Sequence, residues 1–167
     1  MSYRTERDSM GEMLVEEDKL WGAQTQRSYQ NFKIGVGHER MPEEIIRAFA
    51  YVKEAAAIAN AELKPQRMNE EKLNAIREAC EKIRTGELDE HFPLVVFQTG
   101  SGTQTNMNVN EVIAGYSRTH IGTDLHPNDD VNMSQSSNDV FPSAMHIAAC
   151  LEIKEKLFPA IESLIRS

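Results

Sequence analysis

Residues 100–111 carry the densest run of side chains that could bind or orient a polar ligand, Gly-Ser-Gly-Thr-Gln-Thr-Asn-Met-Asn-Val-Asn-Glu. Eight of these twelve side chains are Ser, Thr, Asn, Gln or Glu. Burying such groups without partners costs about 1–3 kcal/mol each. The glycines beside Ser101 let the backbone approach a ligand closely and free its N–H groups to donate. We predict a loop that runs into a helix, with donors directed at an anion or strongly polar group; the alternative is a polar turn followed by a solvated helix.

A second donor-rich stretch spans residues 126–139. It opens with His-Pro-Asn-Asp-Asp-Val-Asn, a composition typical of loops, and continues into Ser-Ser-Asn-Asp at 136–139, four side chains that can cap a helix. Unsatisfied N–H groups and the dipole at a helix start both favour an anion. Two such elements together predict a binding site for a polar anion such as a carboxylate. Neither contains an evident nucleophile–base pair, so chemistry would need groups from elsewhere.

Three other patterns do not define a site. Residues 100–102 lack the Gly-Lys-Ser/Thr of a phosphate loop and the third glycine of a dinucleotide fingerprint. Residues 130–141 begin like a calcium loop, but Gln135 replaces the turn glycine and Phe141 replaces the bidentate glutamate. No two of the five histidines have the i, i+4 spacing of a helical zinc site. We therefore predict no metal and no cofactor.

Composition limits the class of protein. The 167 residues have a net charge of −8, which argues against a nucleic-acid-binding surface. Apolar residues make up 40% and charged residues 26%, as in a globular domain, and no stretch approaches the length of a membrane span. Cys80 and Cys150 lie far apart, as expected of free thiols in a reducing compartment. The N-terminus lacks the apolar core of a signal peptide, and we predict a cytoplasmic protein.

Two amphipathic segments predict scaffold helices that position these elements. The first runs from Pro42, which suits a first helical position, to a break at Pro65. The second follows a capping Asn69 and closes at Gly86. The predicted apolar stripe of the first helix is Ile45, Phe49, Val52, Ala56, Ala59 and Leu63, and that of the second is Leu73, Ile76, Cys80 and Ile83.

Weaker patterns describe the remaining chain. Residues 3–17 should pack as extended segments, and residues 20–32 have loosely helical spacing that Gly35 and Gly37 should end. A third helix is predicted over residues 106–120. Residues 144–165 have an apolar face so broad that a helix there needs neighbours on several sides, yet the sequence stops within the pattern. We therefore expect a truncated helix bundle.

The motifs resemble one enzyme family. Residues 100–112 are similar to the first conserved region of class II fumarases, and residues 126–139 are similar to the second. Residues 20–28, Leu-Trp-Gly-Ala-Gln-Thr-Gln-Arg-Ser, also resemble the family, so the likeness covers essentially the whole chain. The related aspartate ammonia-lyases usually have Gly-Ala-Gly-Thr-Ser and Asn-Pro-Asn-Asp-His-Val-Asn at these places. Ser101, Gln104, His126 and Asp130 therefore favour a fumarase.

The resemblance implies a mainly α fold. Residues 1–135 would form the N-terminal, mixed but mostly helical lyase domain of the fumarase/aspartase fold. Residues 136–167 would be the first helix of a truncated central helix bundle. The implied enzyme is a metal-independent homotetramer that reversibly hydrates fumarate to (S)-malate in the tricarboxylic acid cycle, with active sites where three subunits meet. Its partners would be fumarate and malate, with no nucleic acid and no membrane.

By motif position the resemblance also implies two sets of binding residues. Those that contact substrate or the reacting water would be Ser101, Gly102, Thr103, Ser136, Ser137 and Asn138. A second, non-catalytic carboxylate site would be formed by His126, Pro127, Asn128 and Asp129. The residues just before His126 lack a basic side chain that some relatives place there.

No catalytic residue is predicted within this chain. The family's signature loop, Gly-Ser-Ser-x-Met-Pro-x-Lys-x-Asn, holds the serine assigned as base, and it is missing here, as is the later Gly-Arg-Thr-His segment with the acid–base histidine. We therefore expect the N-terminal part of a fumarate hydratase, inactive by itself. The alternatives are an aspartate ammonia-lyase of the same superfamily, or a non-catalytic binding or structural domain that retains the fold.

Overall fold

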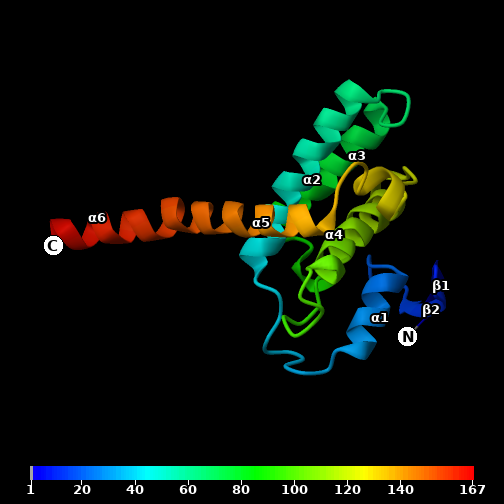
Figure 1. The fold of residues 1–167 in the computed structure, drawn as a ribbon, viewed down its shortest axis with the longest axis horizontal. Coiled ribbons are helices and arrows are strands. Elements are labelled where there is room, and N and C mark those ends of the chain that lie inside the picture. The colour runs from blue at the N-terminus through cyan, green and yellow to red at the C-terminus, as the bar shows by residue number, and fades with distance from the viewer. Residues whose placement is uncertain (1) are drawn as a thin grey trace.

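The computed structural model describes residues 2–167 as a mainly helical protein with one two-stranded sheet (Figure 1). This architecture confirms the predicted fold class. The strands are β1 (Tyr3–Asp8) and β2 (Gly11–Glu16), and the helices are α1 (Ala23–Asn31), α2 (Glu43–Leu63), α3 (Glu70–Arg84), α4 (Thr103–Tyr116), α5 (Ser137–Glu152) and α6 (Phe158–Arg166). Shorter helical turns cover Asp89–His91, Ser117–Ile121, Pro127–Val131 and Ile153–Leu157. No helix within residues 2–167 is long and apolar enough to cross a membrane.

Helix α4 lies at the centre of the fold and contacts α1, α2, α3 and α5 (Figure 1). All twelve of its residues from Thr105 to Tyr116 are buried. The alternative of a solvated helix is therefore wrong. The predicted start at residue 106 is also three residues late, because Gly102 takes a left-handed conformation and the helix begins directly after it. At the other end a π-helical turn carries the helix on to Gly122, as predicted.

A close contact fixes α4 against the chain that leads into α1. Gly115 lies so near this segment that a Cβ atom there would be 2.0 Å from the backbone oxygen of Leu20. Any side chain at Gly115 would therefore push the two segments apart. Because the carbonyl belongs to the backbone, rotation of a side chain could not relieve the overlap.

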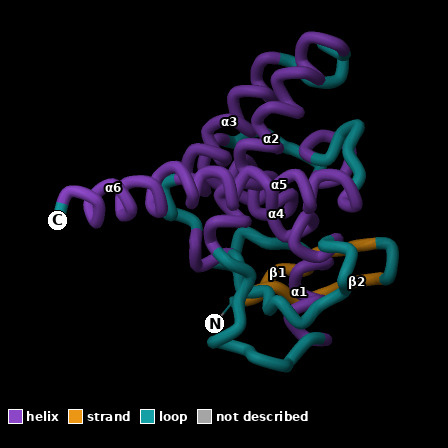
Figure 2. The backbone as a smooth tube through the Cα atoms, turned by 60° about the vertical axis from the view of Figure 1, so that its left-hand side comes forward, coloured by secondary structure: helices purple, strands orange, loops and turns teal. Residues whose placement is uncertain are grey.

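The first strands form a hairpin that packs beside α1 (Figure 2). The strands β1 and β2 pair antiparallel, from Tyr3 opposite Glu16 to Asp8 opposite Gly11. This confirms the prediction of extended segments over residues 3–17. Helix α1 ends at Asn31, where Phe32 turns to an extended conformation, so the prediction that Gly35 and Gly37 end this helix is wrong.

Helix α2 confirms the first scaffold segment but buries a different face from the predicted stripe. Ala59 and Leu63 are exposed, and Leu63 keeps 76% of its surface in solvent. Because α2 packs against both α3 and α5 and also contacts α4, its buried face is broader than an apolar stripe. That face consists of Ile46, Ala48, Phe49, Ala50, Lys53, Ala57 and Asn60. Two of these residues are polar, and sequence reasoning assigned neither of them a role.

Helix α3 agrees with its prediction. The side chain of Asn69 caps its start by accepting a hydrogen bond from the Lys72 N–H at 2.9 Å. Ile76, Cys80 and Ile83 are buried in the core, so Cys80 is confirmed as a core residue. Burial raises the pKa of the Cys80 thiol to about 12, and this group stays protonated at neutral pH.

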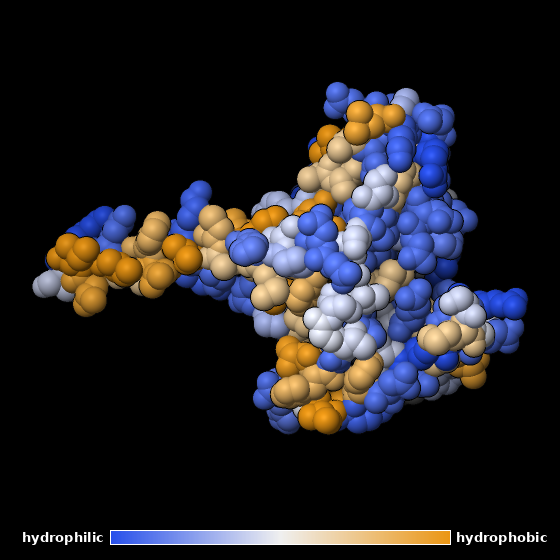
Figure 3. Space-filling model, viewed as in Figure 1, coloured by the Kyte–Doolittle hydropathy of each residue, from blue (hydrophilic) through white to orange (hydrophobic). Residues whose placement is uncertain are grey.

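Helices α5 and α6 continue into one another and project from the body of the protein (Figure 1). The side chain of Ser136 caps the start of α5 by accepting a hydrogen bond from the Asn138 N–H at 3.3 Å. Val140, Ala144 and Ala148 are buried against the body, whereas every residue from 153 to 167 is exposed. Figure 3 shows apolar side chains gathered along this projecting part.

Candidate functional site

The first candidate site is a row of three hydroxyl groups, Ser101, Thr103 and Ser137, which we call the hydroxyl row. The Ser101 Oγ lies 3.0 Å from the Thr103 Oγ1, and the Thr103 Oγ1 lies 3.0 Å from the Ser137 Oγ. Thr103 is the first residue of α4 and Ser137 is the first residue of α5. The free N–H groups of two helices therefore open toward the same exposed surface, where each dipole favours an anion.

Gly102 allows the loop to reach this position. Its φ of +72° is a left-handed conformation, and a Cβ atom there would lie 2.3 Å from Cγ of Phe141 in α5. The Phe141 ring in turn packs against Phe49 of α2, with 5.9 Å between the ring centroids. A side chain at Gly102 would therefore push Ser101 and Thr103 away from Ser137 and α5.

The structure brings the two predicted donor-rich stretches together. Thr103 contacts Ser137, although 34 positions separate them, and Ser136 and Asn138 flank that contact. Thr103 lies in the first helical turn of α4, not on the loop where sequence reasoning placed it. Ser136 already accepts from a backbone N–H, whereas the exposed Asn138 side chain makes no hydrogen bond within the described residues 2–167. Ligand binding by these residues remains a prediction.

A buried polar cluster lies behind the hydroxyl row and consists of Lys53, Asn106, Asn132 and Gln135, here called the Lys53 cluster. The Lys53 side chain is 0% exposed. Its Nζ donates to Asn106 Oδ1 at 2.6 Å, to Asn132 Oδ1 at 3.0 Å and to Gln135 Oε1 at 2.9 Å. The three donors of an ammonium group are thus matched by three oxygen acceptors.

Two opposing effects act on the charge of Lys53. Burial lowers its pKa to about 7, because desolvation penalises the ammonium form. The three oxygens act in the opposite direction, since they accept hydrogen bonds that the ammonium can donate and a neutral amine can donate only in part. Sequence reasoning missed this residue; the available signal was a lysine in the middle of the first scaffold helix, whose other lysine, Lys64, lies at its end.

The second predicted site begins with His126, which caps a helical turn at Pro127–Val131. The loop expected over residues 126–132 is therefore wrong, because Pro127 fits the first position of this turn. The His126 Nδ1 accepts a hydrogen bond from the Asp129 N–H at 3.1 Å, which places the proton of the neutral ring on Nε2. Asp130 anchors the turn from the other side through an ion pair with Lys72 at 2.6 Å.

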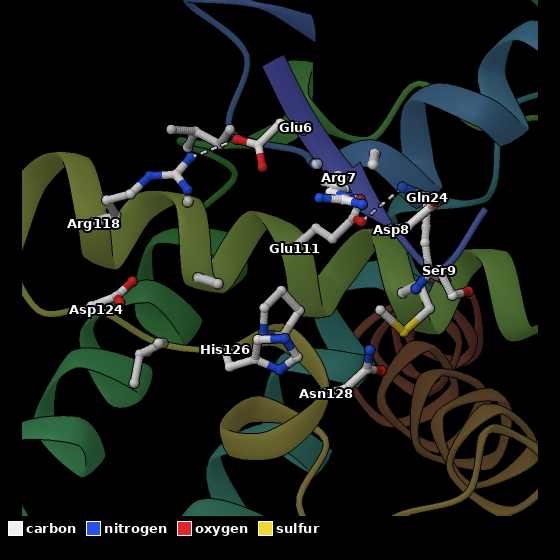
Figure 4. A pocket seen from close by; sticks show the side chains of 18 residues that line it. Glu6, Arg7, Asp8, Ser9, Gln24, Glu111, Arg118, Asp124, His126 and Asn128 are labelled. Carbon is white, nitrogen blue, oxygen red and sulfur yellow. Dashed lines mark hydrogen bonds and ion pairs between the residues drawn. The ribbon is translucent and has the colours of Figure 1, made fainter. Parts of the chain in front are cut away.

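A cavity of about 450 Å³ opens next to this turn (Figure 4). Its wall combines the β1–β2 hairpin, the start of α1, helix α4 and residues 124–128. His126, Pro127 and Asn128 line it, whereas Asp129, the fourth predicted residue, is not part of the wall. Two arginines that sequence reasoning did not consider also line the cavity. Arg118 pairs with Glu6 at 3.0 Å, whereas the exposed Arg7 forms no ion pair within residues 2–167.

Glu111 also borders the cavity, but its carboxylate is used to hold α1. Its two oxygens accept hydrogen bonds from the backbone N–H groups of Gly22 and Gln24, each at 2.9 Å, and of Thr25 at 3.0 Å. Burial raises the pKa of Glu111, although these donors act in the opposite direction. The carboxylate thus satisfies the free N–H groups at the start of α1 and complements the dipole of that helix.

Comparison with known proteins defines the class to which this arrangement belongs. A family model described as lyase matches residues 11–167, and the chain therefore belongs to this lyase family. Within it, the chain is similar to enzymes named class II fumarate hydratase. It is 57% identical over 172 aligned residues to the one from Thermus thermophilus and 54% identical over 169 residues to the one from Bacillus cereus, covering 100% and 98% of this chain.

The fold is similar to that of a solved fumarase over nearly the whole chain. The crystal structure of class II fumarase from Schistosoma mansoni matches 99% of this chain with a TM-score of 0.93 and 42% sequence identity. The chain covers 35% of that structure and 36% of each of the two sequence relatives. It thus spans about a third of the length of the proteins it matches.

The contacts of Glu111 give a testable consequence for stability. Replacing Glu111 with Gln preserves the shape but removes the charge and turns an NH2 group toward backbone N–H donors. We expect the free energy of unfolding to fall by about 1–3 kcal/mol, because at least one buried N–H loses its acceptor. Urea denaturation at pH 7 measures this change. Glu62→Gln on the exposed side of α2 is the control, and equal midpoints for E111Q and E62Q would show that the carboxylate does not stabilise α1.

Proposed function

We propose that this chain forms the N-terminal part of a fumarate hydratase, which adds water reversibly across the double bond of fumarate to give (S)-malate. The observation that carries the proposal is the contact of Thr103 with Ser137 at the starts of two helices. Fumarate is a dicarboxylate, and two helix N-termini beside a row of hydroxyl groups suit one of its carboxylates. The similarity to class II fumarate hydratases supports the same reaction.

In this proposal Ser101, Thr103, Ser137 and Asn138 bind and orient the substrate and the reacting water. Neutral hydroxyl and amide groups donate and accept hydrogen bonds without competing for the proton of the substrate. Their contribution is therefore positioning, which lowers the barrier by holding reacting atoms in place. We assign no acid–base residue to this chain, and the groups that move protons come from other segments of the enzyme.

The proposed function is consistent with a cytoplasmic protein. Cys80 is buried and Cys150 exposed, and both are free thiols, which supports the reducing cytoplasm as the compartment.

We propose residues 1–135 as the lyase domain and residues 136–167 as the start of a central helical bundle. The cap at Ser136 supports a boundary there, because it begins the helix that leaves the body of the protein.

The role of Thr103 and Asn138 can be tested in the complete enzyme. We expect Thr103→Ala and Asn138→Ala to lower kcat/KM by roughly 30- to 900-fold, which corresponds to a loss on the order of 2–4 kcal/mol of transition-state stabilisation. Formation of fumarate from malate, followed by absorbance, measures this. The fold should survive, since neither side chain is part of the apolar core.

Ser143→Ala is the matched control, because this hydroxyl also lies on α5 but donates to the Asp139 backbone oxygen. Normal turnover with a lower unfolding midpoint in the Thr103 and Asn138 variants would show that both residues only cap helices. Release of ammonia from aspartate by the wild type, without hydration of fumarate, would instead favour an aspartate ammonia-lyase.

We also propose that the projecting helix packs in an oligomeric bundle, a homotetramer in the complete enzyme. Ile161, Leu164 and Ile165 are 43%, 74% and 78% exposed, and an apolar face this open favours a partner. These three apolar side chains lie within five consecutive residues of α6 and together form an apolar face of the helix. The same face would enter the core of such a bundle.

A substitution on that face tests whether the chain self-associates through α6 or whether this helix remains without a partner. We expect Ile161→Lys to shift the chain toward monomers, because a lysine ammonium would be desolvated at the contact. Light scattering across a dilution series measures the change. Ser163→Lys adds the same charge at a neighbouring exposed position and should have a smaller effect. A wild-type chain that is monomeric at every concentration would contradict the proposal.

For the second carboxylate site, we propose that Arg7 supplies the basic group that is missing from the residues before His126. Arg7 lines the same cavity as His126 and Asn128, and it comes from the hairpin, far away in sequence (Figure 4). The Nε2–H of His126 and the amide of Asn128 would donate to the same carboxylate. Arg118 contributes less in this proposal, because its guanidinium is already held by an ion pair with Glu6, a carboxylate that it shares with Arg4.

Binding of malate to the chain itself tests this assignment without any need for turnover. We expect (S)-malate to shift the ring signals of His126 in NMR spectra, and Arg7→Gln to weaken this binding at least tenfold. Arg67→Gln, a change of the same kind at an exposed position away from the cavity, serves as the control. Equal malate affinity in R7Q and R67Q would exclude Arg7 as the basic group.

A further inference from the structure

The Lys53 cluster joins two segments that carry the hydroxyl row. Asn106 follows Thr103 by one turn of α4, so its side chain lies next to that of Thr103 along the helix. Gln135 immediately precedes Ser136, the cap of α5. The Lys53 Nζ holds oxygens from both of these residues, at 2.6 and 2.9 Å. We infer that Lys53 is a positioning residue, which keeps Thr103 and Ser137 in contact by tying the starts of α4 and α5 to α2.

The cluster continues beyond Lys53 and fixes the same two segments a second time. The Asn132 Oδ1 that accepts from Lys53 also accepts from the Nδ2 of Asn106 at 3.1 Å and from the Nδ2 of Asn110 at 3.3 Å. The Asn132 Nδ2 donates to the backbone oxygen of Gln135 at 3.2 Å. A shift of residues 132–135 relative to α4 would therefore break several buried hydrogen bonds at once. Such a network holds one arrangement more strictly than an apolar contact would.

The backbone between Asn132 and Gln135 needs this support. Ser134 has a φ of +62°, and it is the one residue other than glycine with positive φ within residues 2–167. A left-handed conformation is unfavourable for a residue with a Cβ atom and persists when surrounding contacts determine it. This conformation gives the chain a sharp turn just before Ser136. The side-chain oxygens on both sides of that turn reach Lys53.

A buried ammonium group is a costly way to fill space in a core. Because Met has a similar length and no charge, an apolar side chain could occupy the position without desolvation. An apolar side chain would, however, leave three buried oxygens of the cluster without this donor. In its ammonium form, Lys53 also places a positive charge near two helix N-termini, where it strengthens the attraction for an anion. Both effects act on the hydroxyl row through other groups, and Lys53 itself need not touch the ligand.

This inference rests on the proposed function for its catalytic consequence, but its structural part is tested separately. The variant is Lys53→Met, and the matched control is Lys64→Met. Lys64 also lies next to α2 and also binds the strained turn, through Ser134 Oγ at 3.1 Å, but this contact is exposed. Hydrogen exchange of the chain, resolved by residue, then compares Thr103–Asn106 and Gln135–Asn138 with the rest of the protein.

We expect K53M to raise the exchange rates of these two segments at least tenfold while α3 keeps its protection, and K64M to change neither. Equal exchange at the hydroxyl row in K53M and wild type would overturn the inference, as would a uniform loss of protection in a folded variant. In the complete enzyme K53M should lower kcat at least tenfold and also raise KM for fumarate. An enzyme that never hydrates fumarate would refute the proposed function, whereas the exchange result would still decide the role of Lys53.

A wild-type measurement covers the case in which K53M does not fold. The Lys53 side chain should give a 15N ammonium signal with three slowly exchanging protons. This signal should show couplings through hydrogen bonds to the side-chain amide carbons of Asn106, Asn132 and Gln135. Detection of these couplings would support the three hydrogen bonds by which Lys53 holds the Lys53 cluster together. A rapidly exchanging amine without them, at a pH below 7, would overturn it.

Discussion

Helix α4 is enclosed on all sides over three turns, and its polar side chains must therefore find partners inside the protein. This constraint organises the elements around it. Glu111 accepts hydrogen bonds from the free N–H groups at the start of α1, and Asn108 donates to the His91 backbone oxygen at 3.1 Å. Asn106 accepts a hydrogen bond from the ammonium of Lys53. Each contact ties α4 to a segment that is distant in sequence. The polar side chains of this helix thus determine where its neighbours lie.

The candidate site is a consequence of the same arrangement. Two helices begin side by side at Thr103 and Ser137, and their starts are held from behind by the Lys53 cluster and from the side by Phe141 against Gly102. The exposed surface then offers hydroxyl groups, an amide and free backbone N–H groups in a rigid frame. Groups of this kind recognise a carboxylate and orient water, and a fixed frame makes that orientation effective.

The cavity beside His126 depends on the anchoring of α1 and the hairpin. Glu111 fixes the start of α1, and Asp8 in β1 pairs with Arg27 of α1 at 2.8 Å. These contacts bring Arg7 to the cavity wall opposite the turn that His126 caps. The hydrogen bonds and burial of this chain thus create two separate polar surfaces, one at the hydroxyl row and one in the cavity. Both are formed by segments that only the fold brings together.

The sequence by itself determined the helical class, the scaffold helices with the Asn69 cap and the core role of Cys80, because caps and apolar spacing act locally. It also identified the two donor-rich stretches and their family. It did not determine that the strip at residues 105–111 is buried, that α2 buries Lys53 and Asn60, or that Arg7 reaches the cavity. Those features depend on contacts between residues 53 and 106, 53 and 132, or 22 and 111. A polar side chain has the same local pattern whether solvent or another segment satisfies it, so only the tertiary structure decided its partner.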